Sequence, residues 1–398
     1  MISLRCSMSI DPAADQKTTP QHYPFLDGIR GIAILWVFLF HSFGAAYGWN
    51  HFPWNGLFRS FDEPRIPVLL FPLSLGGLGV AIFFAVSGFC IHLSHVRNKE
   101  KGWKFFFHRR FFRIYPAYLA AILVFFFLWP WHHYSLHSPT SLRSITAHLF
   151  GVHNLYLHTK FDINPSMWSI GTELQLYAVY PLLLLIMGKF GWGHGLISML
   201  VFELFSKTIG SGVAEDKQSL QLFALSNSPF AYWFSWAIGA YVAQNVIIER
   251  RESFKWVDFR WLILINLAAF LYSPLTFVSF PLVAFTTAVV IDRCIANRWQ
   301  PINFPFGRTI WKHLSWLGII SYSVYLVHQP ILTQAGYLLD KLGLRQHSPV
   351  NLMTACMLLY PLIVAASYGL YRLIEVPFIR LGSNLWRKRK ANLDFQKS

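Results

Sequence analysis

The chain has 398 residues, of which 54% are hydrophobic and 13% are charged. Soluble domains carry about 25% charged residues, so this composition argues against a water-soluble fold and favours a membrane protein. The formal net charge of +16 does not indicate a nucleic-acid partner, because the basic residues occur in short stretches between apolar runs.

Apolar runs long enough to cross a bilayer recur along the chain, and each span needs about 20 such residues. We predict an all-α, polytopic integral membrane bundle of about ten helices, forming one domain over 25–380. Residues 1–24 are predicted to be a disordered tail and 381–398 a basic one. The predicted spans are 29–47, 69–93, 114–131, 166–187, 195–210, 228–248, 259–275, 276–292, 314–338 and 350–378.

Lysine and arginine indicate the orientation of these spans. With the N-terminus inside, 23 of these residues fall on the cytoplasmic side and eight on the outer side. Cytoplasmic loops of membrane proteins are enriched in Lys and Arg. We therefore predict that both termini are cytoplasmic.

No metal site or disulfide is expected. The four cysteines form no CxxC pair, and three histidines are interpreted as loop residues near the membrane surface. Three further histidines recur every five residues, which turns each one off the helical face of the one before. The cysteines are Cys6, Cys90, Cys294 and Cys356. The histidines interpreted as loop residues are His132, His133 and His137, and those spaced by five are His148, His153 and His158.

Ionisable groups within apolar spans are candidates for function, because burying them in hydrocarbon is costly. Arg30 and His41 are eleven residues apart, close to three whole helical turns, and so share one face of the first span. At ~1.5 Å per residue, His41, Glu173 and His328 all lie ~20 Å above the predicted cytoplasmic end. We expect them to form one buried polar site, although each could instead be satisfied separately.

The most basic loop contains Arg110 and Arg113, which are three residues apart and therefore share one helical face. Paired guanidinium groups recognise phosphate oxygens well. The alternative is that these arginines only enforce the orientation of the neighbouring spans.

Two further acidic residues have structural interpretations. Glu375 is expected to form a salt bridge with Arg372 or with an arginine of the 109–113 cluster. Asp27 either caps the first helix, since Asp is favoured at the N-cap, or positions Arg30.

Six motifs, in this order, resemble those of the membrane acyltransferase-3 family, and together they cover 25–380. One departure is Gly171-Thr172 before Glu173, where family members often carry Ser-Val. The motifs are Phe25-Leu-Asp-Gly-Ile-Arg-Gly-Ile-Ala33 with His41; Phe83-Phe-Ala-Val-Ser-Gly-Phe89; Arg110-x-x-Arg113 with Ile114-Tyr-Pro116; Trp168-Ser-Ile-Gly-Thr-Glu-Leu-Gln-Leu-Tyr177; Ser321-Tyr-Ser-Val-Tyr-Leu-Val-His-Gln-Pro330; and Tyr371-Arg-Leu-Ile-Glu-Val-Pro377.

The resemblance implies an O-acyltransferase of a bacterial inner membrane that moves an acyl group, commonly acetyl, from acyl-CoA to a hydroxyl. The implied acceptor is a carbohydrate or a lipid-linked glycan. No permanently bound cofactor is implied, and a C-terminal SGNH esterase-like domain is not expected. The region 190–310 carries no family motif.

Under this resemblance Arg30, Arg110 and Arg113 would hold the phosphates of CoA. His41 would act as general base, for which the ordinary pKa of histidine, ~6.5, is well suited. Glu173 would orient the imidazole and stabilise its protonated form, as carboxylates do in other acyl-transfer triads.

An oxyanion donor is also required, and the candidates are His328, Tyr325 and Ser87. Ser87 alternatively lines the path of CoA. Direct transfer and an acyl-His41 relay both remain open. The competing function is a proton-coupled secondary transporter that uses the intramembrane His and Glu.

Overall fold

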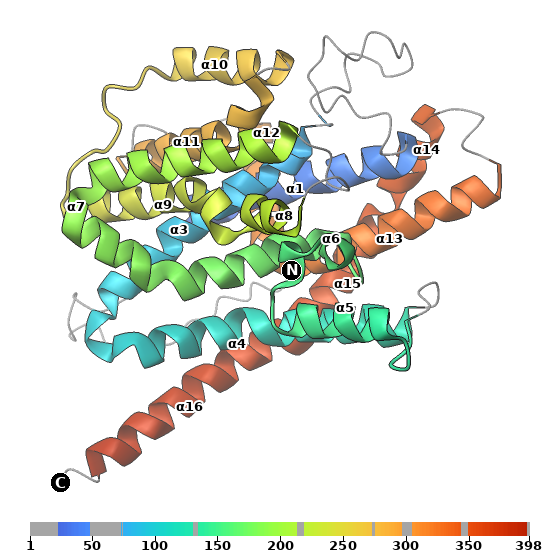
Figure 1. Cartoon of the computed structure of the whole chain (residues 1–398), viewed down its shortest axis with the longest axis horizontal. Coiled ribbons are helices and arrows are strands. Elements are labelled where there is room, and N and C mark those ends of the chain that lie inside the picture. The colour runs from blue at the N-terminus through green and yellow to red at the C-terminus, as the bar shows by residue number, and fades with distance from the viewer. Residues whose placement is uncertain are drawn as a thin grey trace.

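The computed structural model describes residues 23–395, apart from 48–72, 74, 130–133, 213–218, 273–274, 297–304 and 344–348. Every secondary-structure element in this described part of the chain is helical, as predicted (Figure 1). The first helices in chain order are α1 (Pro24–Tyr47), α3 (Gly79–Arg97), α4 (Gly102–Leu123), α5 (Pro139–Leu149), α6 (Leu157–Lys160), α7 (Trp168–Gly212), α8 (Leu220–Asn227) and α9 (Trp233–Val242).

The second half of the chain is also helical. A π-helical turn at Tyr371–Glu375 joins two of its helices, and similar turns extend α4 over Val124–Leu128 and α9 over Ala243–Ile248. The helices are α10 (Phe259–Leu271), α11 (Thr276–Ile295), α12 (Pro305–Ile319), α13 (Ser321–Lys341), α14 (Pro349–Leu358), α15 (Tyr360–Leu370) and α16 (Val376–Phe395).

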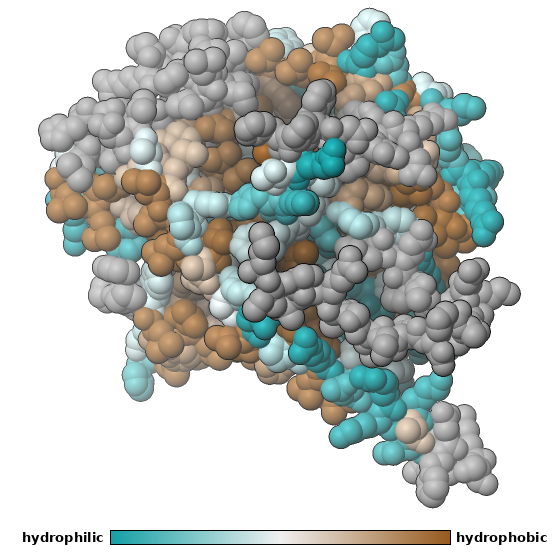
Figure 2. Space-filling view, turned by 180° about the vertical axis from the view of Figure 1, so that it is seen from behind, coloured by the Kyte–Doolittle hydropathy of each residue, from teal (hydrophilic) through white to brown (hydrophobic). Residues whose placement is uncertain are grey.

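The surface of the protein is that of an integral membrane protein that crosses the bilayer several times. Six helical stretches of the described chain are long and apolar enough to span a bilayer. Large apolar side chains stand exposed along α7 and α10, among them Leu185, Ile197 and Trp261, as expected where lipid replaces water. Figure 2 shows apolar side chains over much of one face and hydrophilic ones on the projecting lower corner. The count of ten spans stays a prediction.

Helix α7 contains the predicted span 195–210 and all but the first two residues of the predicted span 166–187. It is bent at Gly191, whose φ of 74° and ψ of 164° are not helical. A positive φ of this size suits glycine, which has no side chain to clash with the backbone. The bend therefore divides one long helix into the two shorter pieces that the sequence predicts.

Helix α1 organises the bundle around the candidate site. It packs against α3, α12, α13 and α14. Its sequence favours an early start, because Pro24 opens the helix and Asp27 lies in the first turn, where a negative charge complements the helix dipole. Arg30 and His41 thereby project from a central helix.

Helices α3 and α9 approach each other so closely that only glycine fits at the contact. A Cβ on Gly88 would lie 1.9 Å from the carbonyl oxygen of Trp236, and one on Gly239 would lie 1.8 Å from that of Ala85. Small residues allow this kind of close packing between membrane helices. The contact fixes Ser87, the neighbour of Gly88, against α9.

The two predicted tails differ in what the structure says of them. Residues 1–22 lie outside the described part of the chain. The predicted basic tail from 381 continues α16 as a helix to Phe395. In Figure 1 α16 runs along α4 and projects away from the remaining helices toward the C-terminus.

Candidate functional site

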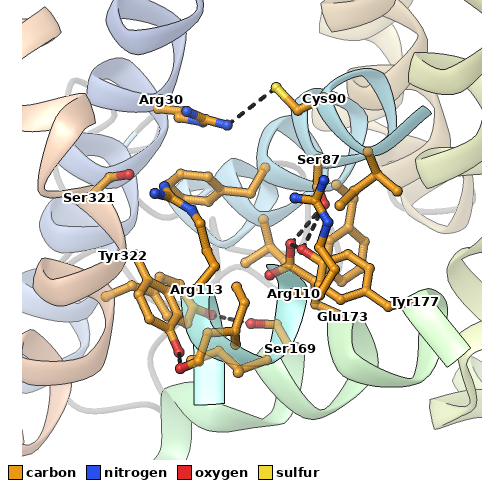
Figure 3. A pocket seen from close by; sticks show the side chains of 17 residues that line it. Arg30, Ser87, Cys90, Arg110, Arg113, Ser169, Glu173, Tyr177, Ser321 and Tyr322 are labelled. Atoms are coloured by element: carbon orange, nitrogen blue, oxygen red, sulfur yellow. Dashed lines mark hydrogen bonds between the residues drawn. The ribbon is translucent and has the colours of Figure 1, made fainter. Parts of the chain in front are cut away.

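A cavity of about 120 Å³ lies between α1, α3, α4, α7 and α13 (Figure 3). Six of the eight predicted site residues line it, and His41 and His328 are the two that do not. Its lining comprises Arg30, Val80, Phe83, Phe84, Ser87, Cys90, Ile91, Arg110, Arg113, Ile114, Ser169, Ile170, Glu173, Tyr177, Ser321, Tyr322 and Tyr325.

Three guanidinium groups make part of the cavity wall strongly positive. Arg30 comes from α1, and Arg110 and Arg113 lie one turn apart on α4. The Nε of Arg110 is buried and has no hydrogen-bond partner within the described part of the chain. Buried donors are normally paired, so this nitrogen indicates a place where an anionic ligand oxygen would be bound.

Arg30 is held in place by two contacts. Its Nη1 lies 3.5 Å from Oδ1 of Asp27, one turn earlier on α1, and its Nη2 donates to Sγ of Cys90 over 3.4 Å. Asp27 lies inside α1 and not before it, so of the two interpretations of Asp27 the structure favours the positioning of Arg30.

Arg113 forms the salt bridge that was predicted for Glu375. Its Nη1 lies 3.8 Å from Oε1 of Glu375, and Ser323 donates to the second carboxylate oxygen over 2.9 Å. Glu375 is 1% exposed and is set by the π-helical turn after α15. This carboxylate therefore ties α4, α13 and the end of α15 together beside the cavity.

The polar group inside the cavity is centred on Glu173. Its Oε1 accepts hydrogen bonds from Ser87, over 2.7 Å, and from Tyr177, one turn later on α7. Trp236 of α9 donates its Nε1–H to Ser87 Oγ over 3.3 Å. Glu173 thus fixes two hydroxyl groups that face the cavity.

His41 and His328, which were predicted to lie at one depth, form a contacting pair. Their ring centroids are 4.8 Å apart, and 3.1 Å separates Nδ1 of His41 from Nε2 of His328. His328 is fully buried and His41 is half-buried. Two spans far apart in sequence thus place their histidines together.

The backbone around this pair fixes which nitrogen carries each proton. Nδ1 of His328 lies 3.0 Å from the carbonyl oxygens of both Val324 and Tyr325. A carbonyl only accepts, so this nitrogen carries the proton and Nε2 of neutral His328 is an acceptor. His41 then donates from Nδ1 to that acceptor and to the Val37 carbonyl, 2.9 Å away, which leaves Nε2 as its basic nitrogen.

The predicted contact between Glu173 and His41 is not made. Among the described residues the carboxylate of Glu173 bonds to Ser87 and Tyr177, whereas the His41 ring pairs with His328. The prediction used depth along each helix, and depth does not give the direction in which a side chain points. His328 takes the position beside His41 that had been expected for Glu173.

Tyr325 separates the cavity from the histidine pair. It lines the cavity, its hydroxyl lies 2.7 Å from Ser169 Oγ, and its ring centroid is 5.5 Å from that of His328. The cavity and the pair are therefore neighbouring parts of one region with an aromatic ring between them.

Gly171, at the departure from the family pattern, lies against the α5–α6 segment. A Cβ at this position would lie 2.9 Å from both the Asn154 side-chain oxygen and the His153 ring. The asparagine in turn donates to Thr172, over 3.2 Å. Gly171 thus lets this segment pack against the turn of α7 that carries Glu173.

His148 and His153 do not lie on one continuous helix, so the prediction that their spacing keeps them on different faces is wrong for this pair. Helix α5 ends at Leu149, and the rings of His148 and His153 stack 3.9 Å apart. Of the three loop histidines, His137 is exposed, whereas 132 and 133 lie outside the described residues.

Sequence reasoning missed Tyr177, Cys90 and Trp236 as site residues. Tyr177 follows Glu173 by four residues and Cys90 follows Ser87 by three, so helical spacing could have found both. Trp236 lies in the region without motifs, where the sequence carried no signal.

Several curated bacterial proteins are similar to this chain. The putative peptidoglycan O-acetyltransferase YrhL of Bacillus subtilis is 24% identical over 351 residues, which is 79% of this chain and 50% of that protein. The peptidoglycan O-acetyltransferase OatA of Listeria monocytogenes is 23% identical over similar shares. The chain thus spans about half the length of these two relatives.

Two further relatives differ in the share of each chain that is matched. The putative membrane-bound transacylase BcsY of Komagataeibacter xylinus is 24% identical over 79% of this chain and 74% of its own length. The regulator of hypoxia-inducible factor 1 of Caenorhabditis elegans is 30% identical over 42% of this chain and 34% of its own. No solved structure matches. The family model described as an acyltransferase domain covers residues 23–372, and the chain therefore belongs to the acyltransferase-3 family.

Proposed function

We propose that this protein is an O-acyltransferase that moves an acyl group, acetyl in the simplest case, from acyl-CoA to a hydroxyl of a carbohydrate or glycolipid. The observation that carries the proposal is that Arg30, Arg110 and Arg113 line the same cavity as the Ser87–Glu173 pair. A polyanionic donor with a narrow, uncharged reactive arm matches this arrangement. The relatives named as O-acetyltransferases support the same reaction class.

In the proposed complex the arginines bind CoA phosphates on the predicted cytoplasmic side. The buried Nε of Arg110 gains an acceptor when a phosphate oxygen binds. The pantetheine arm then extends along the cavity past Ser87 and Glu173 toward Tyr325. The Tyr325 ring, held by its hydroxyl contact with Ser169, must turn aside for the thioester to reach His41.

The chemical step uses the basic Nε2 of His41. This nitrogen takes the proton of the acceptor hydroxyl while the oxygen forms a bond to the thioester carbon. The tetrahedral intermediate breaks its C–S bond, and the leaving CoA thiolate takes the proton back from the imidazolium. His328 stabilises that imidazolium by accepting from Nδ1, as a carboxylate does in a serine-protease triad.

The remaining polar groups have supporting roles in this proposal. Glu173 holds the Ser87 and Tyr177 hydroxyls toward the donor arm, and Tyr325 is the oxyanion donor closest to the histidine pair. The competing transporter interpretation relied on His41 and Glu173 as a proton-sharing pair, and the two side chains bond to different groups.

The test is acyl transfer from labelled acetyl-CoA in membranes of the native host, which contain the acceptor. We expect label in glycan or glycolipid with the wild-type protein, and at least a ~100-fold lower rate with His41→Ala. His158→Ala, which removes an exposed histidine from α6, is the matched control and should label normally. Equal labelling by the wild type and His41→Ala contradicts the mechanism, and labelling by neither contradicts the proposed function.

A further inference from the structure

A second cavity, of about 400 Å³, lies between α4 and α16. Its size is within the range of small-molecule sites. Five cationic side chains line it, and no acidic residue occurs among its described lining residues. The cations are Lys101, Arg109, Arg110, Arg113 and Arg387.

Aromatic rings form one wall of this α4–α16 groove. The ring centroid of Trp386 lies 4.9 Å from that of Phe105 and 5.4 Å from that of His108. Trp386 is half-buried. A flat heteroaromatic base gains free energy by stacking on such rings and by contact with nearby guanidinium groups.

The two helices are fastened to each other beside these rings. His108 donates its Nε2–H to the Gly382 carbonyl over 2.8 Å. A Cβ at Gly382 would lie 2.5 Å from the Phe112 ring, so glycine permits the close packing. The groove is therefore a preformed feature of the fold, which lowers the cost of ordering it around a ligand.

The groove and the candidate site share Arg110 and Arg113 as lining residues. A single elongated ligand can therefore lie in both, with its anionic end in the groove and its arm in the smaller cavity. Helix α16 starts at Val376, beyond the residues matched by the family model, so that match assigns this wall no role.

We propose that the α4–α16 groove binds the nucleotide end of acyl-CoA. Resting on the proposed function, this assignment places the purine against Trp386 and Phe105 and the phosphates on the arginines. Anionic lipid head groups offer the same phosphate chemistry and also favour basic pockets at this membrane surface. The nucleotide is the better match, because a lipid head group would leave the aromatic wall unused.

The experiment measures CoA binding to purified full-length protein in phosphatidylcholine nanodiscs. The variants are Trp386→Ala and Arg387→Ala. Lys388→Ala is the control, since it removes one charge from the opposite face of the same helix. We expect Trp386→Ala to weaken CoA binding about tenfold or more, Trp386→Phe to recover most of it, and Lys388→Ala to bind as the wild type does.

Transfer assays separate the nucleotide from the reactive arm. Trp386→Ala should raise the KM for acetyl-CoA and leave both kcat and the KM for S-acetylpantetheine, which has no nucleotide, within about twofold of the wild type. If Trp386→Ala changes the KM values for acetyl-CoA and S-acetylpantetheine equally, or changes neither, the assignment is overturned. CoA binding that requires Trp386, without any acyl transfer, supports the groove and refutes the proposed function.

A comparison of nanodiscs with different lipids completes the test. Nanodiscs that also contain phosphatidylglycerol should bind CoA in the same Trp386-dependent way. If the wild-type protein selects phosphatidylglycerol and does not bind CoA in phosphatidylcholine alone, the groove is a lipid site and the assignment is overturned.

Discussion

Replacing His328 with phenylalanine tests whether His41 depends on its histidine partner. The substitution keeps a ring of similar size at a fully buried position but removes the acceptor 3.1 Å from His41 Nδ1. In the proposed mechanism that acceptor bonds to a positively charged imidazolium in the transition state. Its loss therefore slows the chemical step more than it weakens donor binding.

The expected size of the effect follows from the strength of this one bond. A hydrogen bond to a charged group contributes about 1.5–3 kcal/mol. At about 1.4 kcal/mol for each factor of ten, His328→Phe should lower kcat by about 10- to 150-fold while KM for acetyl-CoA changes little. His328→Gln carries an amide oxygen that can accept from His41 Nδ1–H, and it should recover most of that loss.

The assay is initial-rate transfer from labelled acetyl-CoA with equal amounts of each protein, checked for folding by size-exclusion chromatography. A His328→Phe rate equal to the wild type would refute the role given to the pair. A glutamine variant as slow as the phenylalanine variant would contradict the hydrogen-bond explanation, because an acceptor at this position would then not restore the rate.

Three further outcomes are expected. Gly239→Ala should lower the free energy of unfolding by about 1–3 kcal/mol or more, and with it the yield of folded protein, because the added Cβ overlaps a carbonyl of α3. Gly188→Ala is the control: it has open space around it and should fold normally in the same thermal unfolding assay. CoA at ten times its Kd should slow alkylation of Cys90, which lines the cavity, about tenfold, as measured by peptide mass spectrometry. Buried Cys356 should stay unlabelled throughout, and unchanged labelling of Cys90 would contradict donor binding in the cavity. Arg113→Ala should lower stability by about 1–2 kcal/mol in thermal unfolding, since it leaves a buried carboxylate without its cation, and no loss would mean that the salt bridge is not stabilising.

The sequence predicts distances along helices well, and this explains which parts of the site were anticipated. A rise of ~1.5 Å per residue puts His41 and His328 at one depth, and their rings touch. Spacing also places Arg110 and Arg113 on the face of α4 that lines the cavity. Residue numbers define positions within each helix, whereas the packing of α1 against α13, which brings the two histidine rings together, is seen only in the structure.

Contacts between helices are harder to predict, because the sequence of one helix does not identify the helix that packs against it. Glu173 has the depth of His41 but points to Ser87 of α3 instead. Trp236 reaches the site only because two glycines bring α9 against α3. The His148 and His153 stack depends on where α5 ends, a boundary that spacing alone did not mark.

The glycine contact between α3 and α9 makes one part of the cavity lining rigid, whereas another part is a side chain that can turn. Backbone atoms meet at Gly88 and Gly239, so the part of the lining that carries Ser87 cannot recede to admit a bulkier ligand. Another part of the lining is the ring of Tyr325, whose hydroxyl contacts Ser169. Room for longer acyl chains should therefore be sought by releasing the Tyr325 ring, as Ser169→Ala does by removing its hydroxyl partner, and not at the α3–α9 contact.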